Sequence, residues 1–135
     1  MNYKYLEHTA DIEFEAYGET LAKAFENAAK ALFNSIIDIS KVEPKKEKKF
    51  EIEAEDQESL LYDFLEQLLI YKDAEKLVFS EFSVEINGLK LKAVVRGEKF
   101  KEEHDQKVDV KAVTYNNMKV GKRGDKYFVH VVVDI

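Results

Sequence analysis

Carboxylates stand close to both ends of this chain. Asp11 lies in a short turn-like link between two strand-like runs, and Asp134 follows three valines with only Ile135 after it. If the fold brings the ends together, Asp11, Asp134 and the terminal carboxylate of Ile135 crowd three anionic groups into one place. When carboxylates lie so close together, each raises the pKa of the others, or the cluster binds a cation. Their oxygens are the ligands that hard cations such as calcium, magnesium or manganese prefer.

This pattern predicts a cation site made of Asp11, Asp134 and Ile135. Two or three oxygen ligands bind a cation weakly and leave coordination positions open to water or to a partner. Such a site suits a transferable or bridging metal better than a structural one. His8 adjoins Asp11 in sequence and either orients it as a supporting hydrogen-bond partner or caps the turn together with Thr9.

The remaining groups that could act as acids, bases or nucleophiles are scattered. There is no cysteine, no pair of histidines at metal-ligand spacing, no glycine-rich phosphate loop and no Gly-x-Ser-x-Gly elbow. His130 stands in an apolar run that ends the chain, and we predict a hydrogen-bonded structural histidine there. His104 stands among acidic residues, and we predict that solvent surrounds it. The sequence therefore shows no sign of a self-sufficient catalytic site.

Composition limits the class of protein. The 135 residues suffice for one domain, 1–135, with a core of its own. Charged residues reach 36%, mostly glutamate and lysine, and cysteine is absent, which is typical of a cytoplasmic protein of a thermophile. We expect neither a signal peptide nor a membrane helix, because no apolar stretch approaches the ~20 residues that a bilayer requires. We therefore expect no membrane partner.

The charge balance also bears on nucleic acids. A net charge of −6 argues against tight, sequence-independent binding to DNA or RNA, because phosphate neutralisation needs a basic surface. The one basic run follows Pro44 and is predicted to be a solvated connector; it comprises Lys45, Lys46, Lys48 and Lys49. We therefore expect no DNA partner, and contact with tRNA only through another protein.

The first half of the chain predicts two strands, a helix, a strand and a second helix. Residues 3–7 and 11–17 alternate apolar and polar side chains in the manner of half-buried strands. Residues 20–36 and 57–74 carry apolar residues at helical spacing, with Thr20 and Asp56 as caps. A third strand is predicted at 48–55, where glutamates alternate with apolar residues.

The second half is predicted to be mostly strand. Asn87 and Gly88 separate two alternating runs, which is the strongest short signal for a β-hairpin. A polar stretch at 97–107 is predicted to lead to a strand at 108–120, and residues 127–134 form the last strand. The order ββαβαββββ favours an α+β fold: a single compact domain with two helices packed on mixed or antiparallel sheet.

Several motifs in this order resemble the archease family. They span the chain with the family's spacing to both ends: His8-Thr9-Ala10-Asp11-Ile12, Phe14-Glu15-Ala16-Tyr17-Gly18, Ala24-Phe25-Glu26-Asn27-Ala28-Ala29, Gly97-Glu98, Val110-Lys111-Ala112-Val113-Thr114-Tyr115 and the terminal Val-Val-Val-Asp-Ile. One position departs from the family, which usually has histidine where this chain has Asn116. Asparagine exchanges hydrogen bonds but is neither an acid nor a base near neutral pH.

The resemblance implies a protein cofactor and not an enzyme. Archeases activate the tRNA-splicing RNA ligase, which uses GTP and manganese, by promoting guanylylation of the ligase and multiple turnover. They can also broaden its choice of nucleotide. The metal-binding positions of the family correspond to Asp11, Asp134 and Ile135, so the expected cofactor is a divalent metal ion, calcium or manganese.

Two other functions are compatible with the same residues. One is a chaperone or adaptor for tRNA-modification proteins, which would bind several proteins and tRNA only indirectly. The other is a small metal-dependent phosphoester hydrolase that uses the same carboxylates, although no general base or nucleophile accompanies them.

Overall fold

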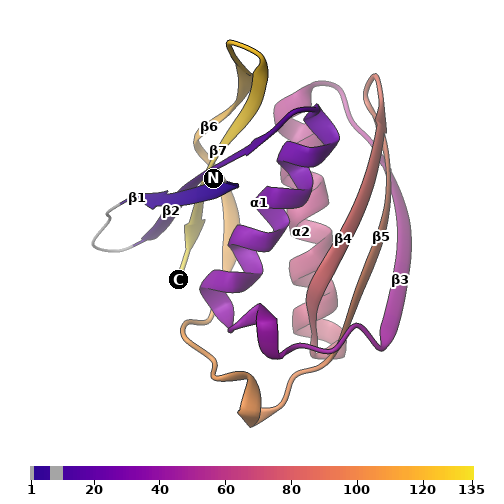
Figure 1. Cartoon of the computed structure of the whole chain (residues 1–135), viewed down its shortest axis with the longest axis vertical. Coiled ribbons are helices and arrows are strands. Elements are labelled where there is room, and N and C mark those ends of the chain that lie inside the picture. Colours follow the sequence, from indigo (N-terminus) through magenta and orange to yellow (C-terminus); the bar gives the residue numbers. More distant parts are fainter. Residues whose placement is uncertain (1, 7–10) are drawn as a thin grey trace.

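The computed structural model describes residues 2–6 and 11–135, which form two antiparallel sheets with two helices between them (Figure 1). The first sheet has the order β1-β2-β7-β6, with β1 at Tyr3–Leu6, β2 at Asp11–Gly18, β7 at Lys126–Asp134 and β6 at Ala112–Arg123. The second has the order β3-β5-β4, with β3 at Lys46–Glu53, β5 at Lys90–Lys99 and β4 at Leu77–Asn87. The predicted element order and the α+β class are confirmed.

The helices α1 (Leu21–Ile36) and α2 (Gln57–Glu75) begin where the sequence predicts. The Thr20 hydroxyl accepts a hydrogen bond from the Lys23 amide at 3.1 Å, and the Asp56 carboxylate accepts one from the Ser59 amide at 2.7 Å. Each cap satisfies an amide that the first turn leaves unpaired. Lys76, in the left-handed conformation, ends α2 and lets β4 begin at once.

The core lies on both sides of the helix layer. α1 packs against β2 and β7 of one sheet and against β4 of the other, while α2 packs against β6, β4 and β3. Aromatic side chains from several elements meet there: Phe33 of α1 contacts Phe79 of β4, and Phe64 of α2 contacts Phe50 of β3. Among the described residues, no helix combines the length and the apolar character that crossing a bilayer requires.

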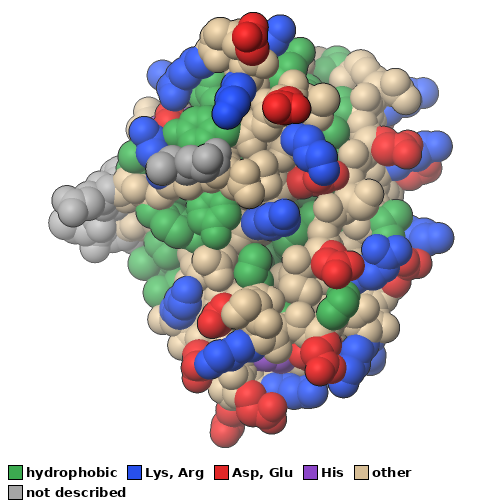
Figure 2. All heavy atoms as spheres, viewed as in Figure 1, with side chains coloured by type: hydrophobic (Ala, Val, Ile, Leu, Met, Phe, Trp, Pro, Cys, Tyr) green, Lys and Arg blue, Asp and Glu red, His purple; other side chains and the backbone are tan. Residues whose placement is uncertain are grey.

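The outer face of the β3-β5-β4 sheet is a ladder of alternating charge. Arg96 of β5 pairs with Glu47 at 2.8 Å on one side and approaches Glu81 at 3.8 Å on the other. Lys92 lies 3.6 Å from Glu51, and Lys90 lies 3.5 Å from Glu53. Figure 2 shows basic and acidic side chains interspersed along this side of the molecule. The face is therefore solvated.

Three predictions about the connecting segments are wrong. The basic run is largely not a connector, because Lys46, Lys48 and Lys49 belong to β3, an edge strand on which lysine discourages pairing with another chain. The 97–107 stretch is not wholly a loop, since β5 continues to Lys99 and Glu98 is buried. The strand predicted at 108–120 is displaced as well, since β6 begins at Ala112 and runs to Arg123.

The prediction for His104 is also wrong. His104, predicted to be solvated, is only 2% exposed and lies at the end of a short 3-10 helix, Glu102–His104. Its Nε2 lies 2.9 Å from a Glu98 carboxylate oxygen, and its Nδ1 accepts a hydrogen bond from the Lys101 amide at 2.9 Å. The charged neighbours in sequence point outward, so the histidine is free to turn inward.

Candidate functional site

The structure meets the condition that the sequence analysis set for Asp11 and Asp134, because the start of β2 lies beside the end of β7, although the N-terminus itself lies toward the other end of β2. β2 and β7 run antiparallel, and in their register Asp11 lies directly opposite Asp134. Directly opposed residues of an antiparallel pair have Cβ atoms about 4.5–5.5 Å apart and point to the same face. Phe14 and Val131 of these strands point into the core, so alternation places both aspartates on the outer face.

No basic side chain of residues 2–6 or 11–135 neutralises this pair. Within the described part of the chain, neither the Asp11 nor the Asp134 carboxylate makes an ion pair with lysine, arginine or histidine. Asp134 is exposed and Asp11 is partly buried, and Ile135, whose terminal carboxylate is the third predicted ligand, is 39% exposed. Residues 2–6 and 11–135 contain no cluster of three or more His, Cys, Asp or Glu side chains suited to a metal ion. The candidate donor set is thus two side chains and one chain end.

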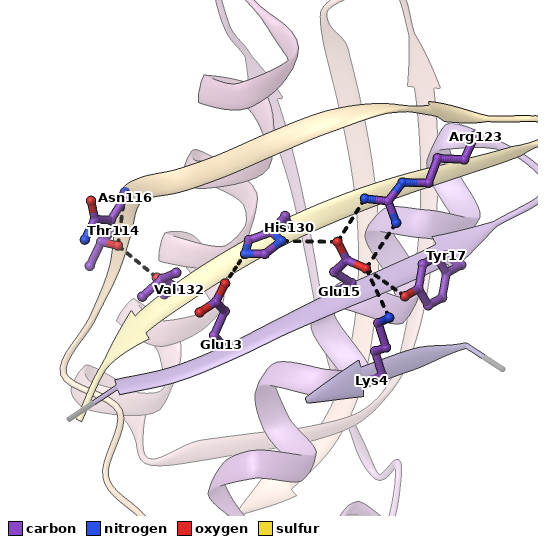
Figure 3. A network of polar contacts seen from close by, with 9 residues as sticks. All are labelled: Lys4, Glu13, Glu15, Tyr17, Thr114, Asn116, Arg123, His130 and Val132. Atoms are coloured by element: carbon purple, nitrogen blue, oxygen red, sulfur yellow. Dashed lines mark hydrogen bonds and ion pairs between the residues drawn. The ribbon is translucent and has the colours of Figure 1, made fainter. Parts of the chain in front are cut away.

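The same face carries a second, buried pair of carboxylates. Glu13 and Glu15 follow Asp11 along β2 at alternate positions, and His130 of β7 lies between them (Figure 3). The His130 Nδ1 is 3.2 Å from a Glu15 oxygen, and its Nε2 makes a short contact with a Glu13 oxygen. Only the doubly protonated ring donates to both carboxylates. The prediction that His130 is a hydrogen-bonded structural residue is confirmed.

Glu15 is the centre of this network. Arg123 of β6 donates to both of its oxygens, at 3.2 and 3.1 Å, and the Tyr17 hydroxyl donates at 2.9 Å. Lys4 of β1 lies 3.8 Å away. The hydrogen bonds from Arg123 are the main reason that the pKa of Glu15 falls to about 2, and burial together with Glu15 raises the pKa of Tyr17 to about 12. Glu15 therefore stays ionised at any ordinary pH.

The structure thus separates two kinds of acidic residue on one face. Glu15 is balanced by Arg123, Glu13 contacts His130, and the network joins the four strands of this sheet. Asp11 and Asp134, at the end of the same row, have no such partner among the residues that the structure describes, and both reach solvent. A divalent cation fits the donor chemistry of this end, because carboxylate oxygens are hard ligands and the pair is otherwise uncompensated.

Some predicted features lie elsewhere or outside the described residues. His8 and Thr9 fall in the segment 7–10, so the predicted support of Asp11 by His8 stays a prediction. Asn116 is exposed on β6, and its backbone amide donates a hydrogen bond to the Thr114 hydroxyl at 3.2 Å.

Sequence reasoning missed the role of the Glu15 network. Glu13 and Glu15 look like ordinary outward-facing residues of an amphipathic strand, and Arg123 looks like part of a turn. The available signal was the scarcity of arginine, since only Arg96 and Arg123 occur among 21 basic residues. Both arginines bind carboxylates, the use for which their forked geometry is best suited.

Comparison with known proteins gives a consistent result. The model of the archease protein family matches residues 3–135. The chain is 48% identical to the "Protein archease" of Pyrococcus abyssi and 46% identical to that of Sulfurisphaera tokodaii, in each case over 98% of both chains. Among solved structures, protein 1598 of Methanobacterium thermoautotrophicum is 40% identical, with a TM-score of 0.89 over 99% of both chains.

A more distant structure agrees in fold. An archease of Thermotoga maritima, described as a possible chaperone, superimposes with a TM-score of 0.66 at 24% identity, covering 98% of this chain and 96% of that one.

Proposed function

Because the chain belongs to the archease family, we propose that it activates the GTP- and manganese-dependent tRNA-splicing RNA ligase. In this proposal the protein catalyses no reaction of its own. It promotes guanylylation of the ligase, so that the ligase turns over repeatedly, and it broadens the choice of nucleotide. The partner is the ligase, in the cytoplasm, and tRNA is met only through it.

The observation that supports this proposal is the uncompensated pair at the end of the β2–β7 ladder. Asp11 and Asp134 face the same side without a basic partner among the described residues, and the terminal carboxylate of Ile135 follows one residue later. In the proposal these groups hold a divalent cation, calcium or manganese, which would supply positive charge toward a nucleotide phosphate.

The position of the pair suits action on another protein. It lies at the rim of a sheet, where the chain ends and a partner's surface has access. In the proposal, the site therefore offers its carboxylates to the active site of the ligase and does not enclose a substrate of its own. The acidic net charge of −6 also disfavours direct capture of RNA.

The experiment follows guanylylation of the ligase from the same organism with GTP and manganese. Wild-type protein should accelerate formation of the covalent guanylate, and Asp11→Ala and Asp134→Ala should remove the acceleration without loss of fold. The matched control is Asp125→Ala, which removes an exposed aspartate from the β6–β7 turn and should leave the acceleration intact. If Asp134→Ala stimulates normally, the site is wrong; if wild-type protein does not stimulate, the ligase role is wrong.

The second candidate function is a chaperone or adaptor for tRNA-modification proteins. It is favoured only by the description of the Thermotoga maritima structure as a possible chaperone. Affinity capture with this protein distinguishes the two roles. Recovery of tRNA methyltransferases without the ligase would favour the adaptor.

A further inference from the structure

β6 departs from regular pairing at one place. Thr114 pairs with Val132 of β7 and Lys119 pairs with His130, so residues 115–118 bulge opposite a single residue of β7. Asn117 within the bulge has a positive φ of 53°. Bulges of this kind re-aim side chains and are common beside functional sites.

Hydrogen bonds hold this bulge in place. The Thr114 hydroxyl donates to the Val132 carbonyl at 3.0 Å and accepts from the Asn116 amide at 3.2 Å (Figure 3). A bulge that is fixed in this way gives the side chains that it carries a defined direction. Tyr115 is the first of them.

The ring of Tyr115 stacks on Tyr62 of α2. The ring centroids are 4.2 Å apart and the planes lie within 4° of parallel. Tyr115 nevertheless remains 54% exposed. Since Tyr62 covers one side of the ring, the solvent-exposed side is the opposite face. The result is a flat aromatic platform, positioned by a strand and a helix together.

Acidic side chains surround this platform. Asp63 and Glu66 neighbour Tyr62 on α2, and burial together with the charge of Glu66 raises the pKa of the Tyr62 hydroxyl. After burial itself, the charges of Asp63, Asp56 and Glu66 raise the pKa of the Tyr115 hydroxyl. In the described part of the chain, none of these three carboxylates forms an ion pair. Burial and the charge of Glu66 also raise the pKa of Asp63, which marks an electrostatic cost that a bound cation would relieve.

We propose that the Tyr62–Tyr115 platform, with Asp63 and Glu66, receives an arginine side chain from a basic segment of a protein partner. A guanidinium group stacks on aromatic faces and at the same time donates in a planar fork to carboxylates. The platform offers both partners side by side. This inference goes beyond the proposed function, because it depends on neither the metal ion nor the identity of the ligase.

Charge decides between a protein and a nucleic acid as the occupant. An exposed tyrosine also stacks on nucleic-acid bases, but proteins that bind single strands in this way place the aromatic ring in a positively charged groove. Here Asp56, Asp63 and Glu66 would repel the phosphates next to a stacked base.

The test is an NMR titration of the intact protein with a capped Gly-Arg-Gly-Arg-Gly peptide, followed through the ring signals of Tyr62 and Tyr115. The same peptide with lysine, the same peptide with glutamate, and hexauridylate serve as comparisons. We expect saturable shifts with the arginine peptide, binding about two- to fivefold weaker with lysine, and none with glutamate or hexauridylate. Binding of hexauridylate in place of the peptide would overturn the proposal in favour of RNA.

Variants locate the binding on the platform. Tyr115→Ala, and separately Asp63→Asn with Glu66→Gln, should each weaken binding of the arginine peptide about two- to fivefold or more, whereas Tyr115→Phe should retain it. Ile70→Ala, an exposed apolar change on the same helix, and Glu103→Gln, an exposed acid elsewhere, are the matched controls. The proposal is wrong if the controls weaken binding as much as the platform variants do, or if the arginine peptide shifts neither ring.

Discussion

Two kinds of carboxylate share the outer face of the β1-β2-β7-β6 sheet. Glu15 has the guanidinium of Arg123 and the ring of His130 as partners. A buried carboxylate needs such partners, because an unpaired buried charge destabilises the fold. Asp11 and Asp134 face each other, and no described residue pairs with either of them as Arg123 pairs with Glu15. The proposed cation would bind at this accessible pair and not at Glu15.

This difference predicts how metal ions affect stability. Calcium or manganese at millimolar concentration should raise the melting temperature of the wild-type protein, because a ligand that binds only the folded state stabilises it by mass action. Asp11→Asn and Asp134→Asn should lose this increase and melt no lower than wild type without metal. Calorimetric scans with added metal and with a chelator measure both effects. An equal metal response in wild type and Asp134→Asn would rule the pair out as the site.

Glu98 predicts a pH dependence of stability. Its carboxylate accepts from the Glu43 amide at 2.9 Å, and it also contacts His104 and Lys101. The hydrogen bond from the Glu43 backbone amide is the main reason that the pKa of Glu98 falls from 4.5 to about 2. Because the folded-state pKa lies below the unfolded one, the stabilisation is complete above pH 4.5 and is lost as the pH falls toward 2.

Glu98→Gln should therefore lower the free energy of unfolding by about 1–3 kcal/mol at pH 7. The difference from wild type should shrink as the pH falls through the interval from 4.5 to 2. Urea unfolding across this range provides the measurement, with Glu103→Gln as an exposed control that should change little at any pH. A difference that is constant with pH would mean that the charge of Glu98 contributes nothing.

At the scale of elements, the pairing of β5 with β4 depends on one glycine. Gly97 pairs with Lys46 of β3 and with Phe79 of β4, just before β4 shifts register. A Cβ atom at Gly97 would lie 1.8 Å from the Val78 carbonyl oxygen and 2.7 Å from the Phe79 Cα. Both contacts are with backbone, which cannot move aside as a flexible side chain can.

Gly97→Ala should accordingly destabilise the protein by about 3 kcal/mol or more. The matched variant is Gly121→Ala in β6, whose added Cβ would meet only the Phe128 ring, at 3.0 Å. Its stability should stay within about 1 kcal/mol of wild type, since better strand propensity offsets the tight contact. Chemical denaturation of the two variants makes the comparison, and equal losses would show that the close approach is unimportant.

The elements that were predictable are those with a local signal. The helix at Leu21–Ile36 follows from its apolar spacing and the Thr20 cap, and the hairpin follows from Asn87 and Gly88. β5 runs past Gly97 because of contacts with distant residues such as Phe79 and Glu43, and no pattern within the segment reveals them. The buried His104 is hidden for the same reason.

The functional residues also differ in how far they could be predicted from the sequence. Asp11 and Asp134 could be named from their residue type and their place at strand ends, but their meeting depended on the pairing of β2 with β7. The Tyr62–Tyr115 platform could not, since it requires both a bulge in β6 and the placement of α2 against that strand. Single-residue patterns do not encode the meeting of two elements.

At the scale of the whole molecule, the β2–β7 ladder brings the C-terminal end of the chain beside the start of β2 at one rim of the sheet, whereas Tyr3 pairs with Ala16 toward the other end of β2 (Figure 1). β7 is a central strand, flanked by β2 and β6, and Asp134 is its last residue. Its backbone carbonyl accepts from the Lys111 amide at 2.8 Å. Ile135 thus follows a residue that is paired on both sides, with Asp11 of β2 and with Ala112 of β6.

This arrangement predicts that the C-terminus tolerates no addition. A short glycine-serine tag after Ile135 would replace the terminal carboxylate by a neutral amide and cover the rim, without disturbing any core contact. Stimulation of ligase guanylylation and the metal-dependent rise in melting temperature should both be lost, while the melting temperature without metal stays within a few degrees of wild type. The same tag before Met1 is the control for bulk. Full stimulation by the C-terminally tagged protein would mean that the terminal carboxylate is not a ligand and that the two aspartates act alone.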